Sequence, residues 1–320
     1  MDRRRFLAAG LACAAAPAWS QGERYPGKPI RVIVPFAAGG GGDFVTRLLA
    51  PRLGELLGTT LLVENRTGAS GNIGTEAALK SPPDGYTLLT ISGTYATQIV
   101  ASKLSFDPYA AITPLTQLTQ ESTVIVVNAQ SPIASLRDLI ERARAAPGKI
   151  TYGSAGRGGL AHLETEYFAA QTGISLVHVP YRGTAGALGD LLGGQIDMVF
   201  GSTSSMAAHV RAGKLRALVI TGAARSRSLP EVPTFADLGM GWTPPLLWHA
   251  LVAPRGLPAP IAEKLVAAIG EALRSREISE RLLAENIEPA PGGPDKLIAL
   301  IRSDAAQWQK VASLIGLKPE

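Results

Sequence analysis

The sequence predicts an α/β protein of two lobes, each an open, mostly parallel sheet flanked by helices. From Lys28 onward, short β-rich runs alternate with amphipathic helical stretches, which is typical of sheets built from strand–helix–strand units. A charge-poor, extended stretch near 113–122 predicts a crossing into a second lobe, and a strand over 248–253 returns the chain to the first. The expected boundaries are residues 25–120 plus 246–320 for lobe 1 and 121–245 for lobe 2.

The first lobe is expected to begin with a strand over 30–34, followed by a glycine-rich loop and a helix over 44–57. Apolar residues recur at helical spacing within that helix, as Val45, Leu49 and Leu53 illustrate. The remaining elements of this lobe are strands predicted at 60–63, 86–91 and 248–253, and helices predicted at 73–80, at 259–284 with a break near Ser275, and at 294–315.

The second lobe repeats the alternation of strands and helices. Ser135 in an N-cap position and the stop at Pro147-Gly148 predict a helix over 135–145. The other elements are strands predicted at 124–128, 150–152, 176–179, 196–200 and 215–221, and helices predicted at 160–171 and 184–192. Two crossings between the lobes indicate a hinge, so we expect a ligand in the cleft to contract the protein.

Composition excludes several classes of protein. The chain has 320 residues, 18% of them charged, a formal net charge of +5 and a single Cys. One Cys cannot build a disulfide-stapled mini-protein or a cysteine-based metal module, and 46% hydrophobic residues argue against a disordered chain. The small positive excess is dispersed along the sequence, so we expect no nucleic-acid partner.

Residues 1–20 have the pattern of an export signal. The basic head Arg3-Arg4-Arg5 precedes an apolar run over 6–16 that is too short to span a bilayer, and small residues favour cleavage near residues 18–20. Arg3-Arg4 also fits a twin-arginine signal, which leaves the export route open. Lipid anchoring at Cys13 is a minor alternative. The expected location is the periplasm.

The strongest local signal is the loop over 35–43, which carries four consecutive glycines between a strand and a helix. Glycines let main-chain N–H groups turn toward a bound group, and the helix adds its positive end, so the loop suits an anion. Asp43 stands where an N-cap belongs, and capping is favoured over ligand contact there. No frame fits G-x-G-x-x-G, and no G-K-[ST] follows, so neither a dinucleotide nor a nucleoside triphosphate is expected.

Two loops of the second lobe have the same form. The loop over 153–159 offers the Ser154 hydroxyl and several N–H donors, but Tyr152 breaks the G-x-S-x-G pattern of a serine nucleophile. The loop over 180–184 leads into a helix for which Thr184 is the expected N-cap. Loops converging from both lobes would clamp a small carboxylate with neutral donors.

Signals for catalysis are weak. The four histidines are scattered without metal-ligand spacing, and a structural role is favoured for His162. No catalytic residue, metal site or cofactor is therefore expected. A secreted α/β enzyme such as a hydrolase remains the alternative from another class.

A set of loop motifs, taken together, resembles one protein family. In chain order the motifs are Tyr25-Pro26-x-Lys28-Pro29-Ile30-Arg31, the loop over 35–43, Glu64-Asn65-Arg66-x-Gly68-Ala69-Ser70-Gly71-Asn72-Ile73-Gly74, Pro83-Asp84-Gly85-Tyr86-Thr87-Leu88, Tyr152-Gly153-Ser154-x-Gly156-x-Gly158, Val179-Pro180-Tyr181-Arg182-Gly183 and Asp190-Leu191-Leu192-Gly193-Gly194-Gln195-Ile196-Asp197. This set is similar to the Bug family, the extracytoplasmic solute receptors of tripartite tricarboxylate transporters.

The resemblance implies a two-lobed periplasmic-binding-protein (Venus flytrap) fold that closes on a small carboxylated ligand. It implies as partners the membrane permease subunits of such a transporter, or a sensor kinase. An orphan sensor receptor with no transporter is a further alternative. The ligand-binding residues that it implies are Phe36, Ala37, Ala38, Gly39, Gly40, Asp43, Ser92, Gly93, Thr94, Ser154, Gly156, Gly158, Tyr181, Arg182, Gly183, Thr184 and Ser202. Arg182 stands where the family often has Lys, and Gly186 where it usually has Pro. The sequence does not identify the carboxylate.

Overall fold

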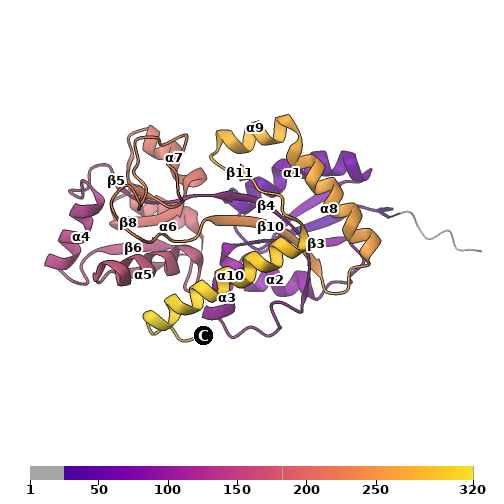
Figure 1. Cartoon of the computed structure of the whole chain (residues 1–320), viewed down its shortest axis with the longest axis horizontal. Coiled ribbons are helices and arrows are strands. Elements are labelled where there is room, and N and C mark those ends of the chain that lie inside the picture. The colour runs from indigo at the N-terminus through magenta and orange to yellow at the C-terminus, as the bar shows by residue number, and fades with distance from the viewer. Residues whose placement is uncertain (1–24, 182, 320) are drawn as a thin grey trace, which may run out of the picture.

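The computed structural model describes residues 25–181 and 183–319 (Figure 1). The predicted leader over 1–20 with its cleavage site, and Arg182, lie outside the described residues. Two sheets lie side by side along the long axis of the molecule, each covered by helices (Figure 1). This arrangement agrees with the predicted α/β class.

The first sheet has the strand order β11-β4-β10-β3-β1-β2. Its strands are β1 (Ile30–Val34), β2 (Leu61–Asn65), β3 (Thr87–Ser92), β4 (Ile112–Glu121), β10 (Leu247–Pro254) and β11 (Glu288–Pro289). Strand β1 pairs in parallel with β2 and β3, whereas β10 is antiparallel to both β3 and β4.

The second sheet has the strand order β7-β6-β8-β5-β9. Its strands are β5 (Thr123–Asn128), β6 (Thr151–Ser154), β7 (Val177–Pro180), β8 (Met198–Ser202) and β9 (Leu215–Ile220). Strand β6 is parallel to β7 and β8, and β5 is antiparallel to β8 and β9. Both sheets are thus mixed rather than mostly parallel, because strands joined by helical crossovers run parallel while β5 and β10, which follow the passages between the sheets, run the other way.

The helices cover the faces of the two sheets and bury their apolar sides in four core clusters. They are α1 (Gly41–Leu57), α2 (Asn72–Leu79), α3 (Gly93–Ala101), α4 (Leu136–Ala145), α5 (Leu160–Thr172), α6 (Thr184–Leu192), α7 (Thr203–Arg211), α8 (Ala259–Arg274), α9 (Arg276–Ala284) and α10 (Gly293–Leu314), with a short 3-10 turn at Ala69–Gly71 before α2. The predicted cap at Ser135 is confirmed, since its side chain accepts a hydrogen bond from Asp138 N. The predicted break at Ser275 is confirmed as well, since Ser275 caps α9.

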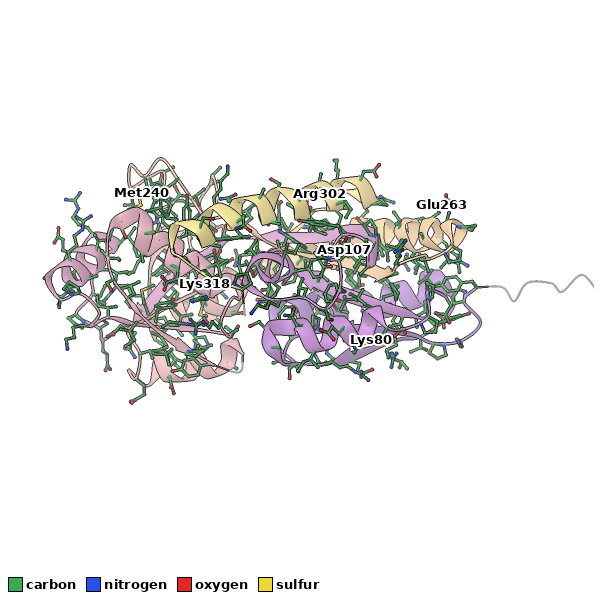
Figure 2. The ribbon with its side chains drawn as sticks, turned by 90° about the horizontal axis from the view of Figure 1, so that it is seen from below. Lys80, Asp107, Met240, Glu263, Arg302 and Lys318 are labelled. Atoms are coloured by element: carbon green, nitrogen blue, oxygen red, sulfur yellow. The ribbon has the colours of Figure 1, made fainter. Side chains whose placement is uncertain are left out.

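The two sheets are connected closely. Strand β4 ends at Glu121 and β5 begins at Thr123, so one residue separates the two sheets at this crossing. Helix α10 packs on α3 and β4 and also contacts α5 of the other sheet, and Figure 2 shows it running from Arg302 toward Lys318 at the second lobe. The buried Trp248 Nε1 donates a hydrogen bond of 2.6 Å to Asp304 Oδ2, which fixes α10 on the first sheet.

Candidate functional site

The glycine-rich loop leads directly into α1, which begins at Gly41 with Gly40 as its N-cap. The helix thus starts three residues before the predicted position, and the expectation that Asp43 is the N-cap is wrong. Asp43 lies in the first turn instead, and its carboxylate reaches back to accept a hydrogen bond of 2.9 Å from Gly39 N. This contact satisfies a main-chain donor just before the helix, as the acidic residue of a capping box does.

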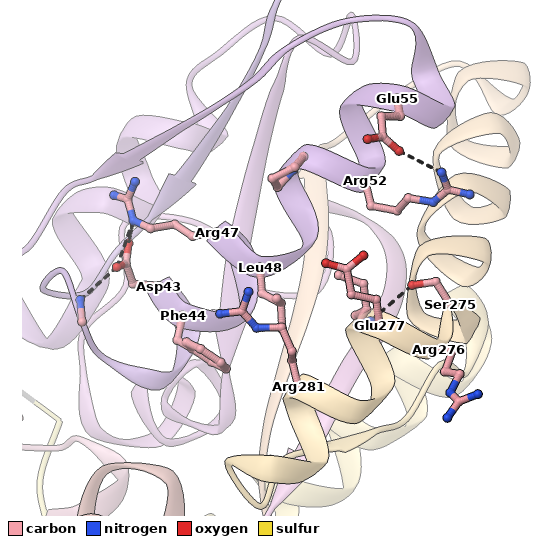
Figure 3. Close-up of a pocket in the computed structure, with 13 residues that line it drawn as sticks. Asp43, Phe44, Arg47, Leu48, Arg52, Glu55, Ser275, Arg276, Glu277 and Arg281 are labelled. Carbon is pink, nitrogen blue, oxygen red and sulfur yellow. Dashed lines mark hydrogen bonds and ion pairs between the residues drawn. The ribbon is translucent and has the colours of Figure 1, made fainter.

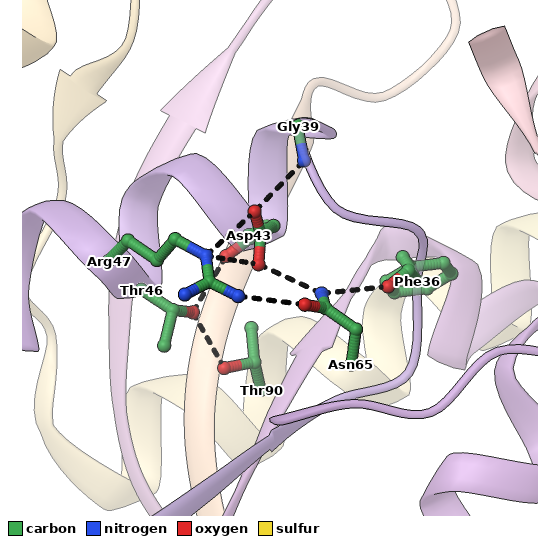
Figure 4. A network of polar contacts seen from close by, with 8 residues as sticks. Phe36, Gly39, Asp43, Thr46, Arg47, Asn65 and Thr90 are labelled. Atoms are coloured by element: carbon green, nitrogen blue, oxygen red, sulfur yellow. Dashed lines mark hydrogen bonds and ion pairs between the residues drawn. The ribbon is translucent and has the colours of Figure 1, made fainter. Parts of the chain in front are cut away.

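The Asp43 carboxylate has two further partners, which Figure 4 shows around it. Asn65 Nδ2 donates a hydrogen bond of 2.8 Å and Arg47 Nε one of 2.9 Å. Burial pushes the pKa of Asp43 up, but the hydrogen bonds from Gly39, Asn65 and Arg47 together hold this pKa below its ordinary value. Asp43 is only 3% exposed, so this carboxylate orders the loop rather than facing a ligand.

Asn65 extends the network from the end of β2 to the loop. Its Nδ2 also donates to Phe36 O at 3.0 Å, and its Oδ1 accepts from Arg47 NH2 at 2.8 Å. One side chain therefore pins both ends of the segment from Phe36 to Asp43. The sequence motif that contains Asn65 gave no sign of this role, because its partners Asp43 and Phe36 are 22 and 29 positions away in the sequence.

The four glycines serve two different purposes. Gly39 has φ +82°, a left-handed conformation that favours glycine, and a Cβ there would meet nothing within 4 Å. Gly41 and Gly42 are helical and close-packed: a Cβ on either residue would lie 3.2–3.3 Å from the ring of His249. Glycine therefore favours close packing at the start of α1. The first N–H groups of that helix, which lack intrahelical partners, point out of its end.

Three of the predicted ligand-binding residues, Ser92, Gly93 and Thr94, lie at the junction of β3 and α3. The Ser92 hydroxyl caps α3 by accepting a hydrogen bond of 3.3 Å from Thr94 N. A Cβ at Gly93 would lie 3.3 Å from the Leu160 side chain of α5, so Gly93 lies where the two lobes pack together. Ser92, Thr94 and Phe36 line a small cavity of about 10 Å³ between this strand end and the loop before α1.

In the second lobe, the Ser154 hydroxyl is engaged inside its own loop. It bonds the main chain of Gly156 through both N–H (3.2 Å) and C=O (3.0 Å), and it lies 2.7 Å from His178 Nε2. Ser154 is 2% exposed, so the hydroxyl that the sequence offered as a ligand donor shapes the loop instead. The contact with His178 joins two strands and had no signal in the sequence.

Two stacked histidines support this loop. The rings of His162 and His178 are 4.2 Å apart, and Tyr152 stacks on His178 at 4.9 Å. His162 Nδ1 accepts a hydrogen bond of 3.1 Å from Gly158 N, which is the structural role favoured by the sequence. Burial, with smaller effects from neighbouring charge, lowers the pKa of His162 to about 3 and that of His178 to about 4, so both rings are neutral at physiological pH.

The loop before α6 differs in one detail from its prediction. Gly183, at φ +120°, is the N-cap, and Thr184 is the first helical residue rather than the cap. The Tyr181 hydroxyl donates a hydrogen bond of 2.6 Å to Asp190 Oδ2, which turns its ring onto α6. A Cβ at Gly186 would lie 3.1 Å from this ring, and this close approach accounts for glycine at that position.

The loops of the two lobes touch across the space between the sheets. Ser70 Oγ donates to Arg157 O at 3.0 Å, and Gln98 Nε2 donates to Gly158 O at 3.1 Å. A Cβ at Gly183 would lie 3.8 Å from Ala37 Cβ. The loop before α1 and the loop before α6 are thus brought together. Ser202 caps α7 at the end of β8, accepting from Ser205 N at 3.3 Å.

The segment 68–71 that carries Ser70 has an unusual backbone. All four residues have positive φ, including the non-glycine residues Ala69 (+46°) and Ser70 (+51°). Such conformations are costly outside glycine and persist where surrounding contacts impose them. On the facing loop, Gly156 has φ +141°, and a Cβ there would lie 2.7 Å from Ser70 Oγ, so glycine is favoured where the two loops meet.

A groove of about 700 Å³ lies between α1 and α9 (Figure 3). Charged side chains line much of it and pair within it, as Arg52 does with Glu55 at 2.8 Å. Of the predicted ligand-binding residues, only Gly39 and Asp43 border it. In the described part of the chain, no cluster of three or more His, Cys, Asp or Glu is placed to hold a metal ion, and no helix is long and apolar enough to cross a membrane.

Known proteins match nearly the whole chain. Residues 45–317 match a family model described as "Tripartite tricarboxylate transporter family receptor". Protein BugT of Bordetella pertussis is 35% identical over 324 residues, which cover 99% of this chain and 99% of BugT. Among solved structures, the periplasmic binding protein BugD has a TM-score of 0.87 at 31% identity, covering 92% of this chain and all of BugD. R. palustris Rpa4515 with adipate has a TM-score of 0.88 at 32% identity, with the same coverage.

Replacing Asn65 tests the network around Asp43. In Asn65→Ala, Phe36 O, Asp43 and Arg47 each lose a partner, so we expect the free energy of unfolding to fall by about 1–3 kcal/mol. Amide exchange at Gly39 should also accelerate. Urea unfolding and hydrogen exchange measure these effects.

Glu64→Gln on the same strand, where Glu64 pairs with Arg31 and Arg66 at the surface, is the control and should change stability by no more than about 0.5 kcal/mol. Equal effects of the two variants would count against the network.

The histidine pair predicts acid sensitivity. A His whose pKa is lower in the folded than in the unfolded state contributes stability that is complete above about pH 6.5 and is lost as the pH falls toward the folded pKa. His162→Gln keeps an acceptor for Gly158 N but does not titrate. We therefore expect its unfolding free energy to fall less steeply than that of wild type between pH 6.5 and 4, by up to about 1.4 kcal/mol per pH unit.

His209→Gln is the matched control for that experiment. His209 lies in the last turn of α7, away from the loop over 153–159. Its substitution should leave the pH slope unchanged in urea unfolding series collected at each pH. A wild-type slope retained in His162→Gln would show that His162 is not neutralised by folding.

Proposed function

The chain belongs to the tripartite tricarboxylate transporter receptor family, and from this premise we propose that it binds a small carboxylate between its two lobes for delivery to a transporter. The family resemblance carried by the loop motifs is thereby confirmed, and this family consists of solute-binding receptors rather than enzymes. Members such as BugD are periplasmic binding proteins. Rpa4515, a similar structure, was solved with adipate.

The observation that carries the proposal is the meeting of two helix N-termini from different lobes. The loop before α1 and the loop before α6 approach at Ala37 and Gly183, and each leads into a helix capped by glycine without a side-chain cap. The first N–H groups of such helices lack intrahelical partners and lie at the positive end of the helix dipole. Together they offer a carboxylate several neutral donors in a fixed arrangement.

The proposed ligand contacts follow from this geometry. Main-chain donors and small side chains of both lobes would face the ligand, while Asp43 and Ser154 hold their loops in shape. The residues proposed to line the site are Phe36, Ala37, Ala38, Gly39, Gly40, Ser92, Gly93, Thr94, Gly156, Gly158, Tyr181, Arg182, Gly183, Thr184 and Ser202. Because N–H donors recognise a carboxylate group and not its carrier, the other residues that line the site would select the ligand.

The proposed setting is the periplasm, after removal of the leader near residues 18–20. The partners proposed there are the membrane permease subunits of a tripartite tricarboxylate-type transporter, with a sensor kinase as the alternative. Residues 25–120 plus 246–320 and residues 121–245 are proposed to move as two lobes about the crossing at Ser122. The ligand would hold them together.

Binding of matched acids and amides tests the proposed function. Succinate, malate, adipate and citrate are screened by thermal shift, and each acid that binds is compared with its diamide or triamide by calorimetry. An acid at about 100 times its Kd should stabilise the protein by about 2.7 kcal/mol, whereas the uncharged amide should not. Tight binding of a neutral sugar or a cation, with none of these or other carboxylates bound, would contradict the proposal.

The same samples also test for ester hydrolysis, the reaction that the Ser154–His178 contact would serve in an enzyme. A receptor should return the carboxylate unchanged, and esters of the same acids should not be hydrolysed. Ester turnover that Ser154→Ala abolishes would favour a hydrolase.

The contact between Ser70 and Arg157 predicts a role in holding the lobes together. Ser70→Ala removes one hydrogen bond between the lobes, so we expect Kd for the bound carboxylate to rise about 2- to 10-fold, mainly through faster dissociation. Stopped-flow dissociation and calorimetry measure the change. Ser81→Ala is the control, because the Ser81 hydroxyl bonds Ala77 O within its own lobe. Unchanged dissociation in Ser70→Ala would mean that this contact is absent from the ligand-bound receptor.

A further inference from the structure

A buried carboxyl group lies at the crossing between the lobes. Glu121 is the last residue of β4, and its side chain is only 2% exposed. One carboxyl oxygen, Oε2, accepts a hydrogen bond of 3.1 Å from Ser204 N in the first turn of α7. Beside it, Ser122 O accepts from both N and Oγ1 of Thr203. The Glu121 carboxyl group therefore connects the first sheet with a helix of the second lobe.

The other oxygen, Oε1, is buried and has no hydrogen-bond partner among the described residues. It lies against the start of α1, since a Cβ at Gly41 would be 3.2 Å from Glu121 Oε1 and 3.2 Å from His249 Cε1. Gly41 is also the first residue of α1, whose N-terminus forms part of the proposed carboxylate site. An unpartnered acidic oxygen thus borders the place where an anion is expected.

No countercharge compensates Glu121 among the described residues. Helix α1 brings only main chain at Gly41, α7 brings Ser204, and β10 brings His249. Burial lowers the pKa of His249 to about 4, so this ring is neutral at physiological pH. Burial also raises the pKa of Glu121 to about 7, against the opposing effect of the Ser204 hydrogen bonds. A buried carboxyl group without a cation holds its proton to a higher pH than an exposed one, so Glu121 changes its charge near neutral pH.

We propose that Glu121 is a proton-linked specificity residue, which takes up a proton when a dianionic carboxylate binds at the N-terminus of α1. This inference rests on the proposed function, because it assigns a ligand class to the same site. A negative ligand beside Gly41 would repel a charged Glu121, and protonation removes that repulsion. The bound state therefore holds more protons than the free receptor, and affinity for a dianion rises as the pH falls.

The proposal separates two kinds of ligand. A dicarboxylate brings only negative charge toward Glu121 and requires the proton. An amino dicarboxylate brings an ammonium group that can pair with the ionised carboxylate, so its binding should release a proton or leave the protonation state unchanged. Glu121 would thereby favour simple dicarboxylates at mildly acidic pH.

Calorimetry in paired buffers of different ionisation enthalpy tests the proposal directly. The probes are succinate, malate and adipate, titrated between pH 6 and 9, with aspartate for comparison. Above pH 7 the three acids are dianions. We expect wild type to take up protons when the dicarboxylate binds at pH 7–8. Above pH 7 its affinity should fall by up to about tenfold per pH unit. This measurement on the wild-type protein needs no variant that folds.

Glu121→Gln and Glu164→Gln identify the titrating group. Gln at 121 imitates the protonated acid, so we expect no proton uptake, a flat pH profile, and tighter binding than wild type at pH 8.5. Glu164 is the matched control: it is another buried acid near the crossing, its pKa is raised to about 8 by burial, and it accepts a hydrogen bond from Thr123 Oγ1. Glu164→Gln should keep the proton uptake of wild type.

The outcomes distinguish the two proposals. Failure of every carboxylate to bind at any pH would remove the proposed function and this inference with it. Binding of a dicarboxylate without proton uptake, or uptake that survives in folded Glu121→Gln, would overturn the role of Glu121 and leave the receptor function intact. Uptake lost only in Glu164→Gln would assign the proton to the other acid and equally overturn the inference.

Discussion

The hydrogen bonds of the Asp43 carboxylate are the constraint on which the first half of the site depends. Asp43 holds Gly39 N, while Asn65 holds Phe36 O and is itself bonded to Asp43 and Arg47. The loop before α1 is therefore held by Asp43 in α1 and by Asn65 at the end of β2, the strand next to β1, and not by its own glycines. Because Asp43 pairs with Arg47, a positive charge offsets the negative charge of Asp43 near the start of the helix.

The second lobe uses different chemistry to the same end. Ser154 and two neutral histidines hold the loop over 153–159, and Gly183 opens α6 without a side-chain cap. In both lobes, side chains shape the loops and the main chain is left to donate. A receptor built this way recognises a carboxylate without a buried cation, and Glu121 then adds sensitivity to the charge that the remainder of the ligand carries.

Local patterns predicted much of the fold. Strand β1 lies at its predicted bounds, and Ser135 and Ser275 cap the expected helices, because strand alternation and capping depend on nearby residues. Helices α3 and α7 were not predicted, since α3 is buried on most sides and α7 opens with Thr and Ser, so neither shows a clear apolar stripe. In the site, Asp43 was misplaced and His178 and Glu121 were missed, because their roles depend on contacts between distant residues.

The central claim is that main-chain donors from both lobes hold one carboxylate. Backbone amide chemical shifts, recorded by NMR as a bound dicarboxylate is titrated, test it most directly. The account predicts large shifts for the amides of Gly41 and Gly42, the first two residues of α1, and of Gly183 and Thr184, with the same saturation point in both groups. Shifts confined to one lobe, or centred on Arg52 and Arg281 in the groove between α1 and α9, would contradict it.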